Sequence, residues 1–240
     1  AYLALEMMDA KNPAAEEQVR AYLAGSNPAV QVRLGSAREL LQALRNADAT
    51  EQLWVVPIHV RNGGVPTTVL LDSAHTVIPL ADPDAPVVVN AGGHGFFRVA
   101  YDGALRDRLT NALGEMNTLE RYSLVDDAWA ATVAGTMSAV DLLQFLDGFV
   151  DEREHAVWQA VVIALRGVSR LVDDDALPQF QSRVCALVQP VLADLGEPRD
   201  GEGDLVGKLR GLLVSTAGVL GGDAATLAMC RDMLNRPVDQ

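Results

Sequence analysis

The stretch Val87-Val88-Val89-Asn90-Ala91-Gly92-Gly93-His94-Gly95-Phe96-Phe97-Arg98-Val99-Ala100-Tyr101-Asp102 separates two parts of the chain that have different sequence patterns. Its β-branched start predicts a strand, and the glycines that follow supply the positive φ angles of a tight turn. Side chains then alternate in character, which predicts a returning strand with Arg98 and Tyr101 on opposite faces. Strand patterns precede this hairpin, and helical patterns follow it to residue 240.

Short apolar segments separated by turn residues fill the part before the hairpin. They predict strands over residues 53–60, 67–71, 75–80 and 86–89, and Pro57 indicates an edge strand or a bulge in the first of them. Short strands at this spacing predict a small β-sandwich over residues 25–102. Residues 1–24 form a predicted helical lead-in. Residues 36–46 fit a helix with Ser36 and Glu39 as a capping box, and a strand is the alternative.

A helical period begins at Gly103 and predicts a series of helices. Thr118 and Ser138 are the predicted N-caps of the second and third, and later helices are predicted over residues 151–171, 177–195, 203–220 and 223–235. The short connections predict antiparallel neighbours and a HEAT-like array over residues 103–240. The predicted fold is therefore multidomain β plus α, a small β-sandwich followed by an all-α helical array.

The composition excludes several classes of partner. The formal net charge is −13, and no basic, aromatic-rich patch offsets it, so a nucleic-acid partner is not expected. No apolar run approaches the roughly 20 residues that span a bilayer, so a membrane partner is not expected either. Cys185 and Cys230 lie in helical patterns and are predicted to be buried free thiols of a cytoplasmic protein, although the sequence leaves a disulfide between them open.

One motif in the chain consists of Asn90, four further residues and then Gly95-Phe96-Phe97-Arg98-Val99-x-Tyr101-Asp102. This motif closely resembles one of the gluzincin zinc aminopeptidases, the family of aminopeptidase N and the puromycin-sensitive aminopeptidase. Trp54 and Pro57 resemble the Trp-x-x-Pro strand of that family. Glu120-Arg121, Glu152-x-Glu154 with Trp158, and Leu209-Arg210 resemble its helical segments. Residues 53–220 match in order and spacing. In this family the motif closes a β-sandwich and leads into a C-terminal helical domain.

The resemblance implies that the chain is the non-catalytic C-terminal portion of an enzyme that removes N-terminal residues from peptides. Its helical domain would wall the substrate chamber and would be truncated here at the C-terminal end. Its partners would be the catalytic and N-terminal domains of the same parent enzyme and the peptide substrates. The residues of the family's structural motif are Trp54, Pro57, Asn90, Gly95, Arg98, Tyr101, Glu120, Arg121 and Trp158.

The ligands that such an enzyme needs for zinc are missing from the sequence. The family uses His-Glu-x-x-His and a later glutamate, whereas His59, His75, His94 and His155 are too far apart in sequence to share a helix face. The parent would hold zinc, and this chain is predicted to bind none. No catalytic residue is predicted in it.

Other residues that resemble active-site groups have structural interpretations. The glycines at 92–95 lack the Lys-Ser/Thr of a phosphate loop, and Asp173-Asp174-Asp175 lacks the ligand spacing of a calcium loop. We expect Tyr101 to pack in the sandwich core and Arg98 to pair with a carboxylate. Glu120 and Arg121 are expected to form an ion pair between domains or helices.

Two other functions stay open from the sequence. The chain fits an independent protein-interaction module made of a β-sandwich and a helical solenoid. It also fits a complete enzyme whose site is not recognisable from motifs. A His-Glu-x-x-His segment encoded upstream of Ala1 would favour the peptidase fragment, and a start codon there would favour the module.

Overall fold

The computed structural model describes residues 2–6, 55–64, 66–73 and 75–235. The chain divides into two compact units, Ala1–Phe97 and Arg98–Gln240. The division follows Phe97, whereas the sequence predicts a boundary after Asp102. Trp54 and the alternatives for residues 36–46 lie outside the described residues.

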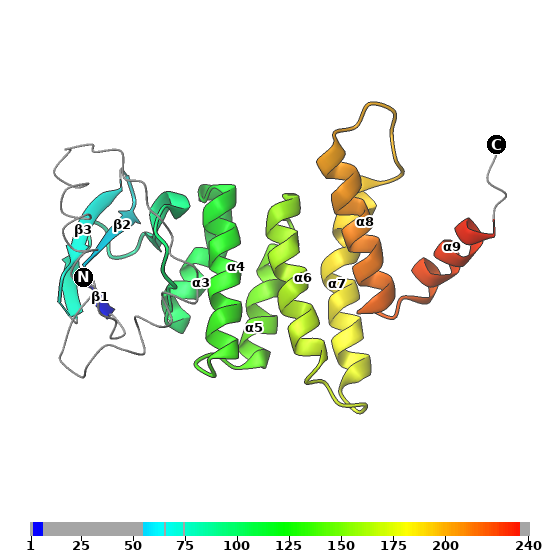
Figure 1. Ribbon diagram of the computed structural model, residues 1–240, viewed down its shortest axis with the longest axis horizontal. Coiled ribbons are helices and arrows are strands. Elements are labelled where there is room, and N and C mark those ends of the chain that lie inside the picture. The colour runs from blue at the N-terminus through cyan, green and yellow to red at the C-terminus, as the bar shows by residue number, and fades with distance from the viewer. Residues whose placement is uncertain (1, 7–54, 65, 74, 236–240) are drawn as a thin grey trace, which may run out of the picture. The chain divides into compact units, whose positions relative to one another are not determined.

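The first unit contains two antiparallel sheets (Figure 1). Strands β3 (Thr67–Leu71), β2 (Val56–Asn62) and β5 (Val87–Val89) form one in that order, and β1 (Tyr2–Glu6) pairs with β4 (His75–Pro79) in the other. These ranges confirm the strands predicted between residues 53 and 89. The strands and the residue before β2 bury apolar side chains, most of them β-branched as strand propensity favours: Val55, Ile58, Val60, Leu71, Ile78, Val87, Val88 and Val89. A β-sandwich stays a prediction.

Two predictions about these strands are wrong. Residues 2–6 were predicted as helix and form β1, because antiparallel pairing with β4, in which Ala4 is opposite Val77, outweighs local helix propensity. Strand β2 was predicted as an edge or bulged strand and is the central strand of its sheet. Pro57 is tolerated there because β5 pairs only with Val60, Arg61 and Asn62, so the proline faces no β5 carbonyl.

The predicted returning strand after residue 95 is also absent from the described structure. Residues 91–93 form a short 3₁₀ turn, η1 (Ala91–Gly93), and residues 94–102 have no regular secondary structure. The turn is closed by side-chain hydrogen bonds of Asn90 rather than by strand pairing. The alternation of side chains in residues 98–101 therefore reflects the packing of Val99 and Tyr101 on a helix.

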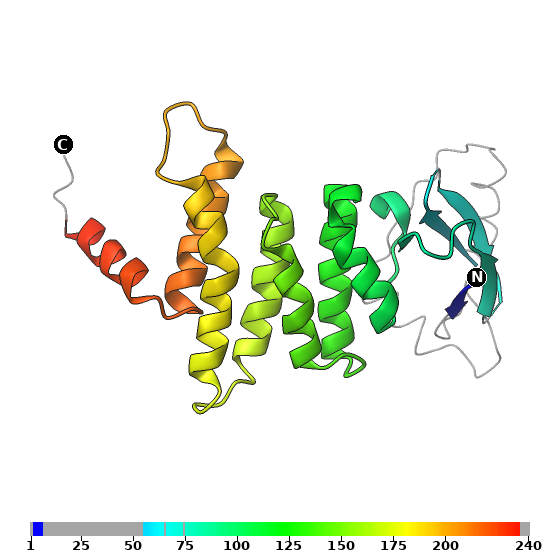
Figure 2. The same ribbon diagram turned by 180° about the vertical axis from the view of Figure 1, so that it is seen from behind.

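The second unit is helical, as predicted from Gly103 onwards. Its helices are α3 (Gly103–Asn111), η2 (Leu113–Glu115), α4 (Thr118–Val133), α5 (Ala139–Leu146), η3 (Asp147–Phe149), α6 (His155–Ser169), α7 (Leu177–Leu195), α8 (Asp204–Val219) and α9 (Ala224–Leu234). Helix α4 packs on α5 and α6, and α8 packs on α6, α7 and α9. Both views show α4, α6 and α7 side by side (Figures 1 and 2). The β plus α class is thus confirmed, and the HEAT-like description of the array stays a prediction.

Side-chain caps set the starts of α4 and α5. Asn117 and Glu120 form the capping box of α4, so the prediction of Thr118 as its N-cap is wrong by one residue. Ser138 accepts a hydrogen bond from the Asp141 N–H and caps α5 as predicted. The core between the helices is built from large side chains that are fully buried, among them Leu142, Phe149, Trp158, Leu165 and Leu213.

Both cysteines are free and partly buried, so the alternative of a disulfide between Cys185 and Cys230 is excluded. Among the described residues, no single helix has the length and apolar character to cross a membrane. Only α8 and α9 taken together reach that length and composition, and they are bent by 116° at their junction.

Candidate functional site

The Asn90 loop ends the first unit and is held by one side chain. Asn90 adopts the left-handed conformation with φ 61° and ψ 40°, which asparagine tolerates better than most residues. Its Oδ1 accepts a hydrogen bond from the Gly95 N–H at 2.6 Å, and its Nδ2 donates to the Gly95 carbonyl at 3.0 Å. A Cβ at Gly95 would lie 2.1 Å from Phe97 Cε1 and 2.9 Å from Asn90 Oδ1. The spacing Asn90-x₄-Gly95 therefore encodes one closed loop.

An ion cluster begins the second unit. The Arg98 guanidinium donates from the same Nη1 to Asp126 and, at 3.3 Å, to Asp127, both on α4. The side chain of Asp127 is only 9% exposed, whereas those of Asp126 and Arg98 are 32% and 59% exposed. The expectation that Arg98 pairs with a carboxylate is confirmed. The structure adds that one cation serves two carboxylates, which fastens the segment of residues 98–102 to α4.

Burial raises the pKa of the Asp127 carboxyl to about 6. The hydrogen bond and charge of Arg98 and a hydrogen bond from the Val99 backbone N–H oppose this rise, and the negative charge of Asp126 adds to it. Desolvation of the Asp127 carboxylate thus raises its pKa by more than the shared contact with the Arg98 guanidinium lowers it. Asp127 therefore loses its proton at a higher pH than an ordinary aspartate.

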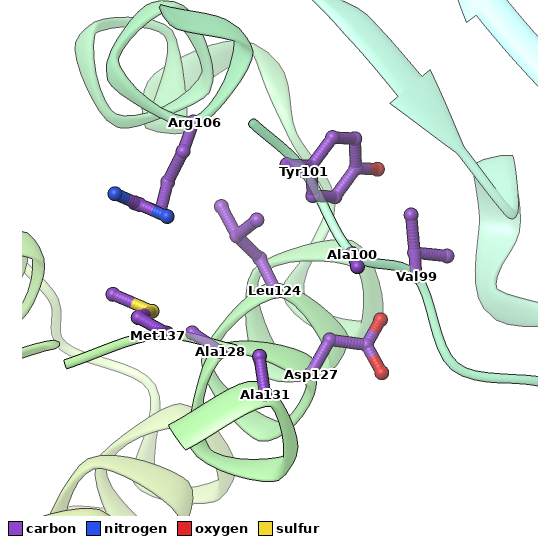
Figure 3. Close-up of a pocket in the computed structure, with 9 residues that line it drawn as sticks. All are labelled: Val99, Ala100, Tyr101, Arg106, Leu124, Asp127, Ala128, Ala131 and Met137. Carbon is purple, nitrogen blue, oxygen red and sulfur yellow. The ribbon is translucent and has the colours of Figure 1, made fainter. Parts of the chain in front are cut away.

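A small pocket lies beside this cluster. It is lined by Val99, Ala100, Tyr101, Arg106, Leu124, Asp127, Ala128, Ala131 and Met137. Figure 3 shows Arg106 and the Asp127 carboxylate on opposite sides of Leu124, with Met137 on the Arg106 side. The cavity volume available to water centres is about 20 Å³, which accommodates a water molecule and not a peptide.

Tyr101 lines this pocket, so its predicted place in the sandwich core is wrong. It belongs to the second unit, and its side chain is only partly buried against α4. The prediction assumed that residues 96–101 continue a sheet. Without a strand partner, Val99 and Tyr101 pack on the apolar face of α4 that Leu124 and Ala128 present.

A second ion pair joins α4 to the connection that precedes α6. Arg121 Nε donates to Glu152 Oε2 at 2.6 Å, and Arg121 Nη1 donates to the Met116 carbonyl at 2.6 Å. Glu152 Oε1 also accepts the N–H groups of Arg153 and Glu154, each at 2.8 Å. The Glu152 side chain is 5% exposed, so several donors satisfy a buried carboxylate.

Trp158 and Glu120 make further hydrogen bonds beside this ion pair. The indole N–H of Trp158 donates to the Glu152 carbonyl at 3.0 Å, and the ring is fully buried. Arg121 forms an ion pair, as predicted, but its partner Glu152 lies in the connection between η3 and α6 rather than in a helix. Glu120 instead caps its own helix by accepting the Asn117 N–H at 3.0 Å. Adjacent residues of a helix do not face each other, which explains why Glu120 and Arg121 have separate partners.

The predicted motif residues do not converge on one atom. Pro57, Asn90 and Gly95 belong to the first unit, and Arg98, Tyr101, Glu120, Arg121 and Trp158 belong to the second. The structure reveals Asp126, Asp127 and Glu152 as the partners of the two arginines. A signal for them exists in the sequence, because Asp126-Asp127 and Glu152 lie within the helical segments that resemble the peptidase family.

The described residues do not fit a zinc site. No group of three or more His, Cys, Asp or Glu side chains lies close enough to hold a metal ion in the part of the chain that the structure describes. The sequence did not predict that the rings of His59 and His94 would lie side by side, with centroids 6.1 Å apart. His59 Nδ1 lies 2.8 Å from the Thr68 hydroxyl oxygen. Two imidazoles are fewer than the ligand set of a structural or catalytic zinc ion.

Comparison with known proteins identifies one family model, the ERAP1-like C-terminal domain, which matches residues 86–240. The Tricorn protease-interacting factor F2 of Thermoplasma acidophilum is 24% identical over 184 residues, covering 76% of this chain and 22% of its own length. Aminopeptidase M1-C of Oryza sativa subsp. japonica is 28% identical over 217 residues, covering 82% of this chain and 25% of its own length. Aminopeptidase A of Gloydius brevicauda is 27% identical over 154 residues, covering 59% of this chain and 16% of its own length.

Proposed function

Because this chain belongs to the ERAP1-like C-terminal domain family, and so corresponds to the C-terminal region of an M1-type aminopeptidase, we propose that it is the non-catalytic portion of a zinc metallo-aminopeptidase. The parent enzyme would remove N-terminal residues from peptides. This portion would shape and close the chamber that admits them. The observation that carries the proposal is the family match over residues 86–240, which includes the whole described helical unit.

The share of the relatives that the chain covers supports a portion rather than a whole enzyme. The chain spans 22%, 16% and 16% of the first three relatives. In the proposal, zinc and its ligands belong to the catalytic domain of the parent, which would contact this chain together with the N-terminal domain. A cytoplasmic location is part of the same proposal and agrees with two free cysteines.

The described contacts suggest what this chain supplies to such an enzyme, namely fixed shape. The Asn90 loop ends the first unit, and the Arg98 cluster fastens the next segment to α4. The Arg121–Glu152 pair joins α4 to the connection before α6. Each contact combines a side chain of the family motif with a buried or backbone partner. A chamber wall that selects peptides by size needs such rigidity, because loose walls admit any length.

The coding sequence upstream of the Ala1 codon tests the proposal directly. An in-frame His-Glu-x-x-His segment is the expected result, and a start codon in place of a catalytic domain would contradict it and favour an independent interaction module. The purified chain alone should retain no stoichiometric zinc after dialysis and should not hydrolyse aminoacyl-anilides. One zinc ion per chain by elemental analysis would overturn this expectation.

The chamber role needs a separate experiment on the complete enzyme. Deleting the residues that correspond to 98–240 should change the ratio of rates for long and short peptides more than the rate for a single aminoacyl-anilide. Zinc content and circular dichroism of the deletion variant serve as controls for the catalytic domain. An unchanged ratio in a zinc-loaded variant would refute a role in closing the chamber.

A further inference from the structure

The Arg98–Asp126–Asp127 cluster contains more negative than positive charge. Arg98 Nη1 is shared between Asp126 and Asp127, and the Asp127 carboxylate is the buried member of the pair. Two carboxylates that share one cation repel each other, and burial disfavours the ionised form further. Burial of Asp127 and its repulsion by Asp126 therefore both oppose the doubly ionised cluster.

The groups around Asp127 do not change this ratio of two carboxylates to one cation. From the segment of residues 98–102 it meets Arg98 and the Val99 N–H, and from its own helix it meets Asp126. Tyr101 of that segment lines the same pocket. Arg106 of α3 lines the same pocket but lies on the opposite side of Leu124 (Figure 3). Ala131 and Met137 carry no charge. Within the described residues, Arg98 is thus the cation that pairs with Asp127.

Water has a route to the buried carboxyl. Asp127 lines the small pocket, whose volume of about 20 Å³ suits a water molecule. A proton can therefore reach Asp127 without unfolding of α4. The cluster also lies at a sensitive point of the chain, because Arg98 is the first residue of the second unit.

We propose that the Arg98–Asp126–Asp127 cluster is a pH-sensitive latch that holds residues 98–102 on α4 more tightly in mildly acidic than in neutral solution. Protonation of Asp127 removes the repulsion and the desolvated charge, while Arg98 keeps its ion pair with Asp126. The segment of residues 98–102, at the start of the second unit, is then most mobile above neutral pH. This regulation goes beyond the proposed peptidase role and does not depend on it.

The sign is opposite to that of an ordinary salt bridge. The carboxyl of a simple ion pair has a lowered pKa, and acid weakens the pair. The pKa of Asp127 is raised to about 6, so the latched state binds the proton more tightly than the released state, whose carboxyl has an ordinary pKa of about 3.9. The ratio of the latched to the released population therefore rises about tenfold when the pH is lowered from 7.5 to 5.0.

Native-state hydrogen exchange of the full chain tests the latch. The Val99 amide, which donates to Asp127, should become about tenfold more protected from pH 7.5 to pH 5.0 after correction for intrinsic exchange rates. The ¹³Cγ signal of Asp127 should titrate in the same window. Amides of α6 around Trp158 serve as the internal control and should show no such change.

Two variants separate the latch from general acid effects. In the Asp127→Asn variant the Val99 amide should be protected from exchange at both pH values, because the substitution removes the titrating charge and keeps a hydrogen-bond acceptor. Asp126→Asn should be more protected than the wild type at pH 7.5 and less pH-dependent, because Arg98 then serves Asp127 alone. Protection of Val99 that falls or stays constant on acidification of the wild type would overturn the proposal, whether or not the variants fold.

Discussion

Asn90 combines two properties that few residue types share. It occupies the left-handed region at φ 61°, and both polar atoms of its side chain bind the backbone of Gly95. Glycine would keep the first property and lose the second, whereas alanine would lose both. This difference allows the two contributions to be measured separately.

Asn90→Ala should lower the free energy of unfolding of the first unit by about 2–4 kcal/mol, from the strained φ and two lost hydrogen bonds. Asn90→Gly should cost only about 1–2 kcal/mol, because the φ angle remains allowed. Urea titrations followed by the amide signals of β2 and β5 measure both. Equal losses in the two variants would show that the backbone conformation contributes nothing.

The two arginines of the motif show how far sequence reasoning reaches at this scale. The charge and position of Arg98 and Arg121 predict ion pairs. The identity of the partners does not follow from the sequence. Asp126 and Asp127 become neighbours of Arg98, and Glu152 becomes a neighbour of Arg121, only through the turn that precedes residue 98 and the packing of α4 on α6. The buried character of Asp127, which determines its titration, is likewise a property of the folded chain.

Burial should separate the effects of two ion pairs on stability. Glu152→Ala leaves Arg121, 17% exposed, without its carboxylate and should cost about 3–5 kcal/mol. Asp194→Ala removes an exposed partner of Arg153, whose own side chain is 37% exposed, and should cost less than about 1 kcal/mol. Urea unfolding followed by tryptophan fluorescence compares them. A similar loss in both variants would contradict the importance assigned to Glu152.

At the scale of elements, the helices were predictable and the conformation of residues 94–102 was not. The predicted cap Ser138 locates the start of α5, and the helix predicted over residues 223–235 agrees closely with α9, whose N-cap is Asp223. Residues 96–101 alternate like a strand, yet alternation records only which side chains are covered. Here α4 covers Val99 and Tyr101, and no neighbouring strand is available to the backbone among the described residues.

Glycines inside helices test the packing of these elements. A Cβ at Gly167 of α6 would lie 2.1 Å from the Trp129 ring of α4, whereas a Cβ at Gly211 of α8 would meet nothing within 4 Å. Gly167→Ala should therefore destabilise the second unit by about 1–3 kcal/mol through overpacking. Gly211→Ala should stabilise it by about 0.5–1 kcal/mol through higher helix propensity. Thermal unfolding by circular dichroism distinguishes the signs, and a gain in both variants would show that α4 and α6 are not in close contact.

At the scale of the whole molecule, the sequence indicates a β part and a helical part because the period of apolar residues changes near residue 100. The exact boundary depends on the Arg98 cluster, which draws residues 98–102 to the helical unit. A motif that reads as one hairpin in the sequence therefore belongs to two units. Its first half closes a loop, and its second half attaches to a helix.

Helix α9 presents apolar side chains that the described residues leave uncovered. Thr226 is buried and Leu227 packs near Gly218 of α8, but Met233 and Leu234 are 58% and 85% exposed. At 100° per residue, Leu234 lies close to the direction of Leu227, and Met233 lies close to that of Thr226. The face that contacts α8 in the first turns of α9 thus continues, exposed, in its last turn.

We expect this exposed face to cause concentration-dependent association of the isolated chain, because contiguous apolar surface favours burial against any available copy. Met233→Glu with Leu234→Glu should shift the average mass measured by sedimentation towards the monomer. Ala225→Glu with Ala228→Glu adds the same charge on the opposite face of α9 and should leave the association unchanged. If both double variants dissociate the chain equally, net charge rather than the apolar face governs association. If the wild type is monomeric at all concentrations, the last turn of α9 has no tendency to bind another copy.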